Sequence, residues 1–332
     1  MKSITLIIAE HNEGQQLNDT LDSILSTSNH DLYDIVVVSD GSTVPLNLEK
    51  YKDLVKHVKT KERGGVGAAF DEGFSAVSTP NVITMGSDIR FLENGYIEKM
   101  LDILEDNRKS LVCTTNIGIN AERMDIHHPK SIRRHGARVL FFLKAEDLPK
   151  NTRLFKPGDP RLPNYRNILE AKWISKQEGS LYEIPCILGA FYGMSSEWYG
   201  HIKGYWGHRY WGTLEPYISL KSWFAGGDCK MAVDIEVAHI FKQRPSHVTH
   251  VHDLLYNKLF VSEALFPPKI ARVFIDFLGM NEHINRAKRM VLENRKKLKE
   301  VRDYHESIFT RDIFWFYERF PCKYFELIEE LK

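Results

Sequence analysis

Residues 4–13 read Ile4-Thr5-Leu6-Ile7-Ile8-Ala9-Glu10-His11-Asn12-Glu13, and this stretch decides the fold class. The run from 4 to 9 is almost entirely apolar, which is typical of a strand buried on both faces of a parallel sheet. The chain then changes at once to charged and amide side chains. The stretch therefore predicts a central strand with a polar carboxyl end.

The same unit recurs along the first hundred residues. Helical periodicity is present at 15–25 and 67–77, and further strands are predicted at 33–38, 57–59 and 81–85. Strands separated by helices of this length indicate an α/β fold with a doubly wound, Rossmann-like, mostly parallel sheet.

Polar residues stand where three of these strands end. They are Glu10-His11-Asn12-Glu13, Asp40 and Ser87-Asp88. Because doubly wound sheets bind ligands at the carboxyl ends of their strands, the recurrence predicts a nucleotide-binding crevice. A solvated turn or a helix cap would explain any one of them alone.

The rest of the chain is less regular. Residues 120–182 are rich in Pro, Arg, Lys and His and lack periodicity, so we interpret them as an excursion that faces the acceptor. Pro267-Pro268 marks a boundary, beyond which the pattern is helical. The predicted domains are a catalytic domain at 1–266, divided into a nucleotide-binding half at 1–110 and an acceptor and metal half at 111–266, and a helical C-terminal extension at 267–332.

Composition excludes several classes of protein. The chain has 332 residues, 43% hydrophobic and 27% charged, with a net charge of +1, so it offers no strong overall field to nucleic acid or an anionic membrane. Its four cysteines lack disulfide or zinc spacing. No apolar run approaches the roughly 20 residues that span a bilayer, and no signal-peptide pattern is present. These features predict a cytoplasmic protein with reduced thiols.

Two residues far apart in the sequence could hold a metal ion. Asp88 follows the strand at 81–85, and His239 follows the apolar stretch 231–237. A carboxylate at a strand end can hold a divalent cation against a diphosphate, and manganese accepts mixed oxygen and nitrogen ligands. Lys242 lies three residues on and could reach phosphate. Each residue alone is more often structural; the combination favours a metal site.

A longer set of motifs resembles a known family. In chain order they are His11-Asn12-Glu13, Asp40, Arg63 with Gly65, Gly86-Ser87-Asp88, Gly189-Ala190-Phe191, Trp211-Gly212, Ser219, Trp223, Gly226-Gly227, His239-Ile240-Phe241-Lys242 and residues 314–321. This set resembles the signature of the polypeptide N-acetylgalactosaminyltransferases (family 27), and its N-terminal motifs are shared with family 2 glycosyltransferases. The resemblance spans nearly the whole chain except the middle excursion and part of the basic segment near the C-terminus.

The resemblance implies a GT-A fold and transfer of a hexose from a UDP-sugar with Mn²⁺ or Mg²⁺, with retention of the anomeric configuration. It implies that His11, Asp40 and Arg63 hold the nucleoside side, Ser87 lies against the donor, Lys242 contacts the diphosphate, Trp211 walls the donor site, Gly189 leaves room for the sugar, and Asp88 and His239 ligate the metal.

Three departures from the family pattern affect these roles. Gly86 stands where the family has the first Asp of its D-x-D motif. Leu214 replaces a Glu, and Ala68 and Phe70 replace paired Arg residues. These changes leave the metal pair in place and put the choice of sugar and acceptor in doubt.

Glu215, which replaces an Asn of the family pattern, is a candidate catalytic residue. A carboxylate at about this place in family 2 enzymes acts as the general base of inverting transfer. If Glu215 does so, the product is β-linked, whereas the retaining route gives an α-linked product. A substrate-binding or structural carboxylate is the alternative.

The segment 286–302 carries eight basic residues against two acidic ones, and 127–135 adds a second basic cluster. We predict a basic helix at 286–302 that could contact nucleic acid or anionic lipid, although a solvated helix face explains such a run more simply. If both clusters face the crevice, DNA with a hydroxymethylated base joins proteins and glycans as a candidate acceptor, presented as a flipped-out base.

Two other functions remain open. A nucleotidyltransferase would normally carry a glycine-rich phosphate loop after the first strand, and Glu10-His11-Asn12-Glu13 is not one. A nucleotide-sugar-binding module without catalysis is suggested by Gly86 and Leu214. The family's lectin-like module and membrane anchor have no counterpart in this sequence, which favours a bacterial or viral protein.

Overall fold

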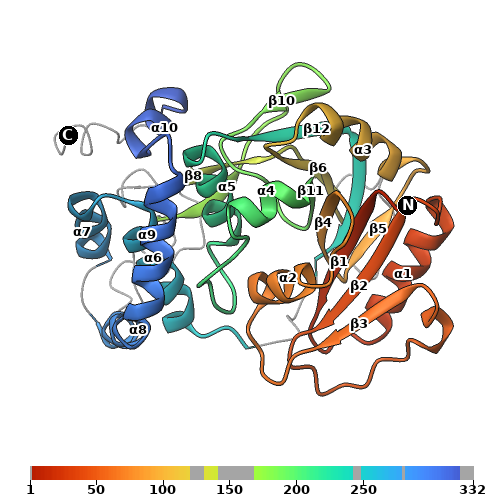
Figure 1. Cartoon of the computed structure of the whole chain (residues 1–332), viewed down its shortest axis with the longest axis horizontal. Coiled ribbons are helices and arrows are strands. Elements are labelled where there is room, and N and C mark those ends of the chain that lie inside the picture. Colours follow the sequence, from red (N-terminus) through yellow and green to blue (C-terminus); the bar gives the residue numbers. More distant parts are fainter. Residues whose placement is uncertain (1, 120–130, 141–167, 242–247, 279–280, 322–332) are drawn as a thin grey trace.

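A computed structural model describes residues 2–119, 131–140, 168–241, 248–278 and 281–321 (Figure 1). Ten strands form one sheet whose main path runs β10-β12-β6-β11-β4-β1-β2-β3, with β5 beside β12 and β7 beside β6. A separate two-stranded sheet joins β8 and β9. In these residues, the fold is the α/β class that the sequence predicts.

The N-terminal part of the sheet is parallel. Its strands are β1 (Ile4–Glu10), β2 (Tyr33–Ser39), β3 (Val55–Lys59) and β4 (Asn81–Gly86). The β1–β2, β2–β3 and β1–β4 pairs are all parallel, and Ile4 lies between Tyr33 and Asn81. All four predicted strands are confirmed, and their carboxyl ends lie along the same edge.

The second half of the sheet is mixed. Its strands are β5 (Ile89–Phe91), β6 (Ser110–Ile119), β7 (Ile132–Arg134), β10 (Leu181–Glu183), β11 (Phe191–Ser195) and β12 (Asp228–Ile240), while β8 (Ala137–Leu140) and β9 (Glu170–Trp173) form the small sheet. The β6–β12 pair is parallel, whereas β11 runs antiparallel to both β4 and β6. Three short strands, β7 to β9, and the start of β10 therefore lie within 120–182, the segment for which the sequence pattern predicts no periodic element.

Helices cover both faces of the sheet, because alternate residues of the buried strands point to opposite sides. Ile4, Leu6 and Ile8 of β1 pack in the core beneath α1 (Gln15–Thr27) and α3 (Tyr96–Asp106). Ile7 and Ala9 pack in the opposite core, toward the remaining helices. The helices on that side are α2 (Val66–Phe74), α4 (Ser196–His201) and α5 (Leu214–Phe224).

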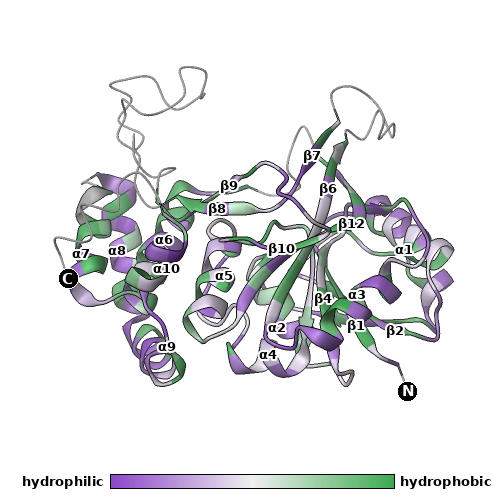
Figure 2. Cartoon of the chain, turned by 90° about the horizontal axis from the view of Figure 1, so that it is seen from above, coloured by the Kyte–Doolittle hydropathy of each residue, from purple (hydrophilic) through white to green (hydrophobic). Residues whose placement is uncertain are grey.

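The C-terminal helices gather at the end of the molecule opposite to β3 and α1 (Figures 1 and 2). They are α6 (Val251–Leu265), α7 (Pro268–Phe277), α8 (Glu282–Glu293), α9 (Arg295–Ile308) and α10 (Ile313–Arg319). The helical character of this region is confirmed, and α7 begins next to the predicted boundary. The hydrophobic core is continuous from α5 through α6 to α10, and the division into domains stays a prediction. No described helix is long and apolar enough to cross a membrane.

The prediction of one basic helix at 286–302 is wrong, because the segment belongs to two helices. Asn294 ends α8: its backbone N–H and its side-chain Nδ2 both donate to the carbonyl of Met290, at 3.2 and 2.8 Å. A new helix, α9, starts at the next residue. Asn favours such boundaries because its side chain competes for backbone hydrogen bonds.

Candidate active site

Asp88 and His239 come together through strand pairing. Asp88 lies between β4 and β5, and His239 lies near the end of β12, which pairs antiparallel with β5 so that His239 faces Ile89. The N–H of Ile240 donates to the carbonyl of Asp88 at 3.0 Å. This register places His239 Nε2 3.4 Å from Asp88 Oδ1, with the two side chains 20% and 16% exposed. Strand register therefore joins two residues that are 151 positions apart in the printed numbering.

Gly86 leaves the space that the Asp88 carboxylate occupies. A Cβ at position 86 would lie 2.7 Å from Asp88 Oδ1, well inside van der Waals contact. The departure from D-x-D thus removes one carboxylate and at the same time accommodates the position of the other.

The pair fits a divalent cation that is completed by a substrate. In the described part of the chain, no group of three or more His, Cys, Asp and Glu side chains gathers around one point. Mg²⁺-type sites commonly use one or two protein ligands, with phosphates and water filling the octahedron, and neighbouring ligands about 2.1 Å from the ion lie about 3 Å apart. Nδ1 of His239 is buried without a hydrogen-bond partner among the described residues, so Nε2 is the nitrogen that faces Asp88 and a ligand.

Glu215 lies in the first turn of α5 beside Gly189. A Cβ at position 189 would lie 2.5 Å from Glu215 Oε1, so only glycine leaves this carboxylate in place. Burial raises the pKa of Glu215, whereas backbone N–H groups and the nearby His239 act in the opposite direction. A carboxyl group with a raised pKa next to the predicted metal pair suits proton transfer. Gly189 is predicted to leave room for a sugar. In the structure, its missing side chain leaves room for the carboxylate of Glu215, and the contact with a sugar stays a prediction.

The end of β2 is organised by Asp40, which is almost fully buried. Its two carboxylate oxygens accept the backbone N–H groups of Gly64 and Gly65, each at 2.7 Å. His11 Nδ1 lies 2.7 Å from the Asp40 carbonyl oxygen. Asp40 therefore positions the loop that carries Arg63, and its predicted contact with a nucleoside stays a prediction.

Arg63 is presented by a loop that pairs with a distant segment. The N–H of Tyr210 donates to the carbonyl of Gly64 at 2.6 Å, and Gly65 forms an isolated parallel bridge with Tyr210. Gly65 has φ of 93°, and a Cβ there would collide with the Tyr210 backbone, so this contact requires glycine. Arg63 Nη1 donates to the carbonyl of Val248 at 3.1 Å.

The remaining predicted site residues occupy different environments. Ser87 is buried, and its carbonyl accepts the Thr20 hydroxyl at 2.7 Å. Trp211 is 47% exposed, and its carbonyl accepts Asn257 Nδ2 at 3.1 Å. Lys242 lies outside the described residues. The roles of these three residues stay predictions.

Two departures from the family pattern are core positions. Leu214 is 8% exposed, and a Cβ at Gly67 would lie 3.1 Å from it, so the α5 start packs closely on α2. Phe70 packs against the rings of Tyr192 and Tyr205, with centroids 6.4 and 5.9 Å away. Both side chains serve packing between helices and sheet.

An aromatic and guanidinium stack lies against His239, and no sequence motif predicts it. The ring of Phe241 lies edge-on to His239 at 4.4 Å between centroids. Arg134 lies between Phe241 and Trp173, 4.4 and 3.8 Å from their ring centroids. A Cβ at Gly118 would collide with Arg134. Arg134 belongs to the basic cluster noted in the sequence, but its spacing could not reveal that it stacks on aromatic rings.

Comparisons with known proteins show which proteins this chain is similar to. Residues 5–161 match the family described as glycosyl transferase family 2. Polypeptide N-acetylgalactosaminyltransferase 10 of Homo sapiens is 26% identical over 73% of this chain and 38% of its own length. Polypeptide N-acetylgalactosaminyltransferase 8 of Drosophila melanogaster is 23% identical over 98% of this chain and 52% of its own length. The chain thus spans about half, or less, of these relatives.

A solved structure of GalNAc-T7 with UDP, GalNAc and Mn²⁺ superposes with a TM-score of 0.70 and 17% identity, covering 96% of this chain and 56% of the other. This likeness shows that the fold is the GT-A fold that the sequence motifs imply. The chain therefore has the GT-A fold, its residues 5–161 match the glycosyl transferase family 2 model, and it is similar to the polypeptide N-acetylgalactosaminyltransferases.

Proposed function

We propose that the protein is a metal-dependent glycosyltransferase that takes a sugar from a UDP-sugar and transfers it to a hydroxyl group. The observation that carries the proposal is the 3.4 Å approach of Asp88 and His239 at the edge of the sheet where the parallel strands end. Relatives named as polypeptide N-acetylgalactosaminyltransferases, and the UDP and Mn²⁺ in the GalNAc-T7 structure, support the donor and the metal.

In this proposal, Asp88 and His239 hold Mn²⁺ or Mg²⁺, and the bound ion would neutralise charge on the departing diphosphate. Asp40 fixes the loop that brings Arg63 to the nucleoside side. Glu215 holds a proton-accepting carboxylate beside Gly189, where the sugar and the acceptor hydroxyl would meet. The raised pKa of Glu215 favours a role as general base and hence inversion; the relatedness to the N-acetylgalactosaminyltransferases favours retention.

The acceptor is proposed only as a hydroxyl on a protein, a glycan or a hydroxymethylated DNA base. A cytoplasmic location and a bacterial or viral source remain predictions from the sequence. A binding module that has lost catalysis is the second candidate, because Gly86 removes one acidic residue of the motif.

Donor turnover separates the two. A panel of nucleotide-sugars with Mn²⁺ is first screened by thermal shift, since a ligand at a hundred times its Kd stabilises the folded state by about 2.7 kcal/mol. An active enzyme then releases UDP slowly from the stabilising donor, and the release stops when the metal is chelated. Stabilisation by a donor without any release of UDP would favour the binding module, and no stabilisation by any UDP-sugar would contradict both.

A further inference from the structure

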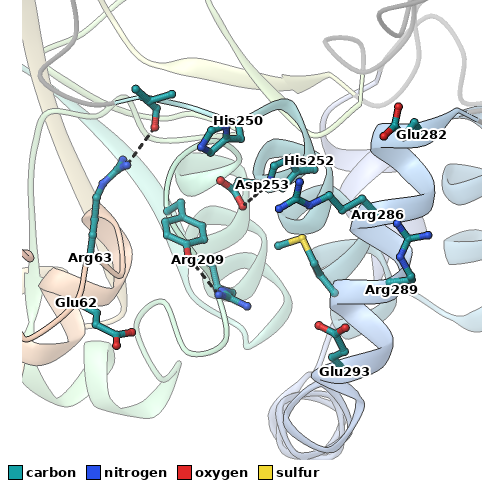
Figure 3. Close-up of a pocket in the computed structure, with 13 residues that line it drawn as sticks. Glu62, Arg63, Arg209, His250, His252, Asp253, Glu282, Arg286, Arg289 and Glu293 are labelled. Atoms are coloured by element: carbon teal, nitrogen blue, oxygen red, sulfur yellow. Dashed lines mark hydrogen bonds and ion pairs between the residues drawn. The ribbon is translucent and has the colours of Figure 1, made fainter.

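A pocket of about 950 Å³ lies between the GT-A core and the C-terminal helices (Figure 3). One wall carries Arg63 and Arg209, and the opposite wall is the face of α8 with Arg286 and Arg289. Neither Asp88, His239 nor Glu215 lines it, and among the described residues of the predicted donor site Arg63 alone does. We call it the arginine pocket.

The four arginines of this pocket form no ion pair with any carboxylate in the described part of the chain. Arg63 and Arg209 donate only to neutral groups, the carbonyl of Val248 at 3.1 Å and the hydroxyl of Tyr210 at 3.3 Å. Guanidinium groups repel one another and bind phosphate and carboxylate well, so an unpaired set around one pocket indicates an anionic ligand.

The start of α6 adds further polar groups to the same pocket. His250 and His252 stack with their rings 5.1 Å apart and 11° from parallel. Burial lowers the pKa of His252, Asp253 opposes this, and the positive charge of Arg286 acts in the same direction as burial. Figure 3 shows Arg286 extending from α8 toward His252 and Asp253. The pocket thus offers imidazole rings and guanidinium groups side by side.

Carboxylates limit which anion fits. The pocket is also lined by Glu62, Asp253, Glu282 and Glu293. A long polyanion would meet these negative groups, whereas a compact ligand can place its phosphate on the arginines and donate hydrogen bonds from hydroxyl or amino groups to the carboxylates. The volume also suits one small ligand, since ligand pockets measure about 300–1,000 Å³.

We propose that the arginine pocket binds the acceptor through a phosphate ester, in the form of a nucleotide or a sugar phosphate unit that also carries hydroxyl groups. The pocket shares Arg63 with the predicted donor site through the loop that Asp40 holds, so an acceptor bound there lies next to the nucleoside side of that site. This assignment to the acceptor rests on the proposed glycosyl transfer.

Helix α9 shows that basic residues nearby are not equivalent to those of the pocket. Its Lys297, Lys299 and Arg302 pair within the helix with Glu300, Asp303 and Glu306. Within the basic segment, the arginines that line the arginine pocket belong to α8 and none of the lining residues belongs to α9, so charge removed from α9 provides a matched control.

The test is titration calorimetry on the full chain saturated with UDP and Mn²⁺, so that the donor site is filled. Thymidine monophosphate and glucose 6-phosphate are titrated, with thymidine and glucose as controls without phosphate. We expect one of the phosphates to bind and its control to bind at least about tenfold more weakly, the size of one charge-assisted contact. The phosphate that binds more tightly identifies a nucleotide or a sugar phosphate as the acceptor unit.

The double variant Arg286→Ala/Arg289→Ala should weaken phosphate binding at least about tenfold, because it removes two charge-assisted contacts. Lys296→Ala/Lys299→Ala on α9 removes the same charge and should leave it unchanged. Three results would overturn the proposal: no phosphate binds, the arginine variant binds as well as the parent, or it loses UDP affinity to the same extent. Failure of the proposed function would give a different result: the protein would release no UDP from any donor, while phosphate binding would persist.

Discussion

The proposed metal crevice, formed by Asp88 and His239, and the arginine pocket are built in different ways. Asp88 and His239 are fixed by strand register, with Ile240 hydrogen-bonded to the Asp88 carbonyl. Arg286 and Arg289 are exposed on a helix that reaches its place by packing on α6. A ladder of backbone hydrogen bonds fixes side-chain positions closely, as a reacting group requires. A helix face distributes charged side chains over a wider area, which is sufficient to bind a charged ligand.

The largest effect is expected from the metal crevice. Asp88→Ala or His239→Ala should each reduce metal-dependent turnover at least about a thousandfold, because a metal's stabilisation of transition-state charge is worth several kcal/mol. UDP release is measured with Mn²⁺, and the melting temperature is compared with that of Asp102→Ala, an exposed control on α3. Full turnover in either site variant would remove the metal assignment, and a large loss in Asp102→Ala would show that the effect is not local.

Glu215 tests the chemical step within the same crevice. Glu215→Gln keeps the shape and removes the base, so an inverting route predicts a loss in kcat of about a hundredfold or more. The variant's pH profile should also lose the ionisation assigned to this carboxyl group. A loss below about tenfold, well short of the general-base contribution, would instead support the retaining route.

Gly189 tests how closely that carboxylate is positioned. Gly189→Ala places a Cβ 2.5 Å from the present position of Glu215 Oε1 and must displace it. A displacement near 1 Å can lower turnover about a hundredfold, so kcat should fall while the protein stays folded. Gly200→Ala is the matched control, because its nearest neighbour would be 3.9 Å away. Equal activities of the two variants would show that the position of the Glu215 carboxylate does not affect turnover.

The last prediction concerns the stability of the fold and rests on two buried histidines, His208 and His305. His208 lies next to Arg209 of the pocket, and its Nε2 donates to the carbonyl of Gly212, three residues before Glu215. Burial lowers the pKa of His208 to about 4 and that of His305 to about 3. Nδ1 of each ring is buried without a partner among the described residues, so a second proton finds no acceptor.

Both folded-state values lie below the usual pKa of histidine near 6.5, so the unfolded chain binds protons more readily. The stabilisation is present above pH 6.5 and is lost as the pH falls toward 4, by about 1.4 kcal/mol per pH unit for each histidine. Urea unfolding at pH 7 and at pH 5 measures this loss. A variant with His208→Gln and His305→Gln should show a flatter dependence; an unchanged slope would contradict this origin.

Much of the crevice could be predicted from the sequence because parallel strands bring their ends together. The apolar run before Glu10 and the polar residues Asp40 and Asp88 indicate three such strand ends. The motif around His239 indicates the residue that lies opposite Asp88. The antiparallel contact between β5 and β12 needed the structure, since a three-residue strand has no detectable periodicity.

Other features depend on packing that a sequence pattern does not encode. Asp40 was expected to contact a nucleoside, and its carboxylate holds two backbone N–H groups. The stack of Arg134 on Phe241 joins β7 to the residue that follows β12, two segments that are distant in sequence and that both lie beside β6. The arginine pocket requires α8 to end at Asn294 and face the core, whereas charge counting alone merges its residues with those of α9.

The most direct test of the central claim is Mn²⁺ binding measured by electron paramagnetic resonance, with and without UDP. If Asp88 and His239 grip an ion that a diphosphate completes, the parent chain will bind Mn²⁺ tightly only when UDP is added. Asp88→Ala and His239→Ala will then lose this UDP-dependent binding. Undiminished binding in either variant would contradict the account.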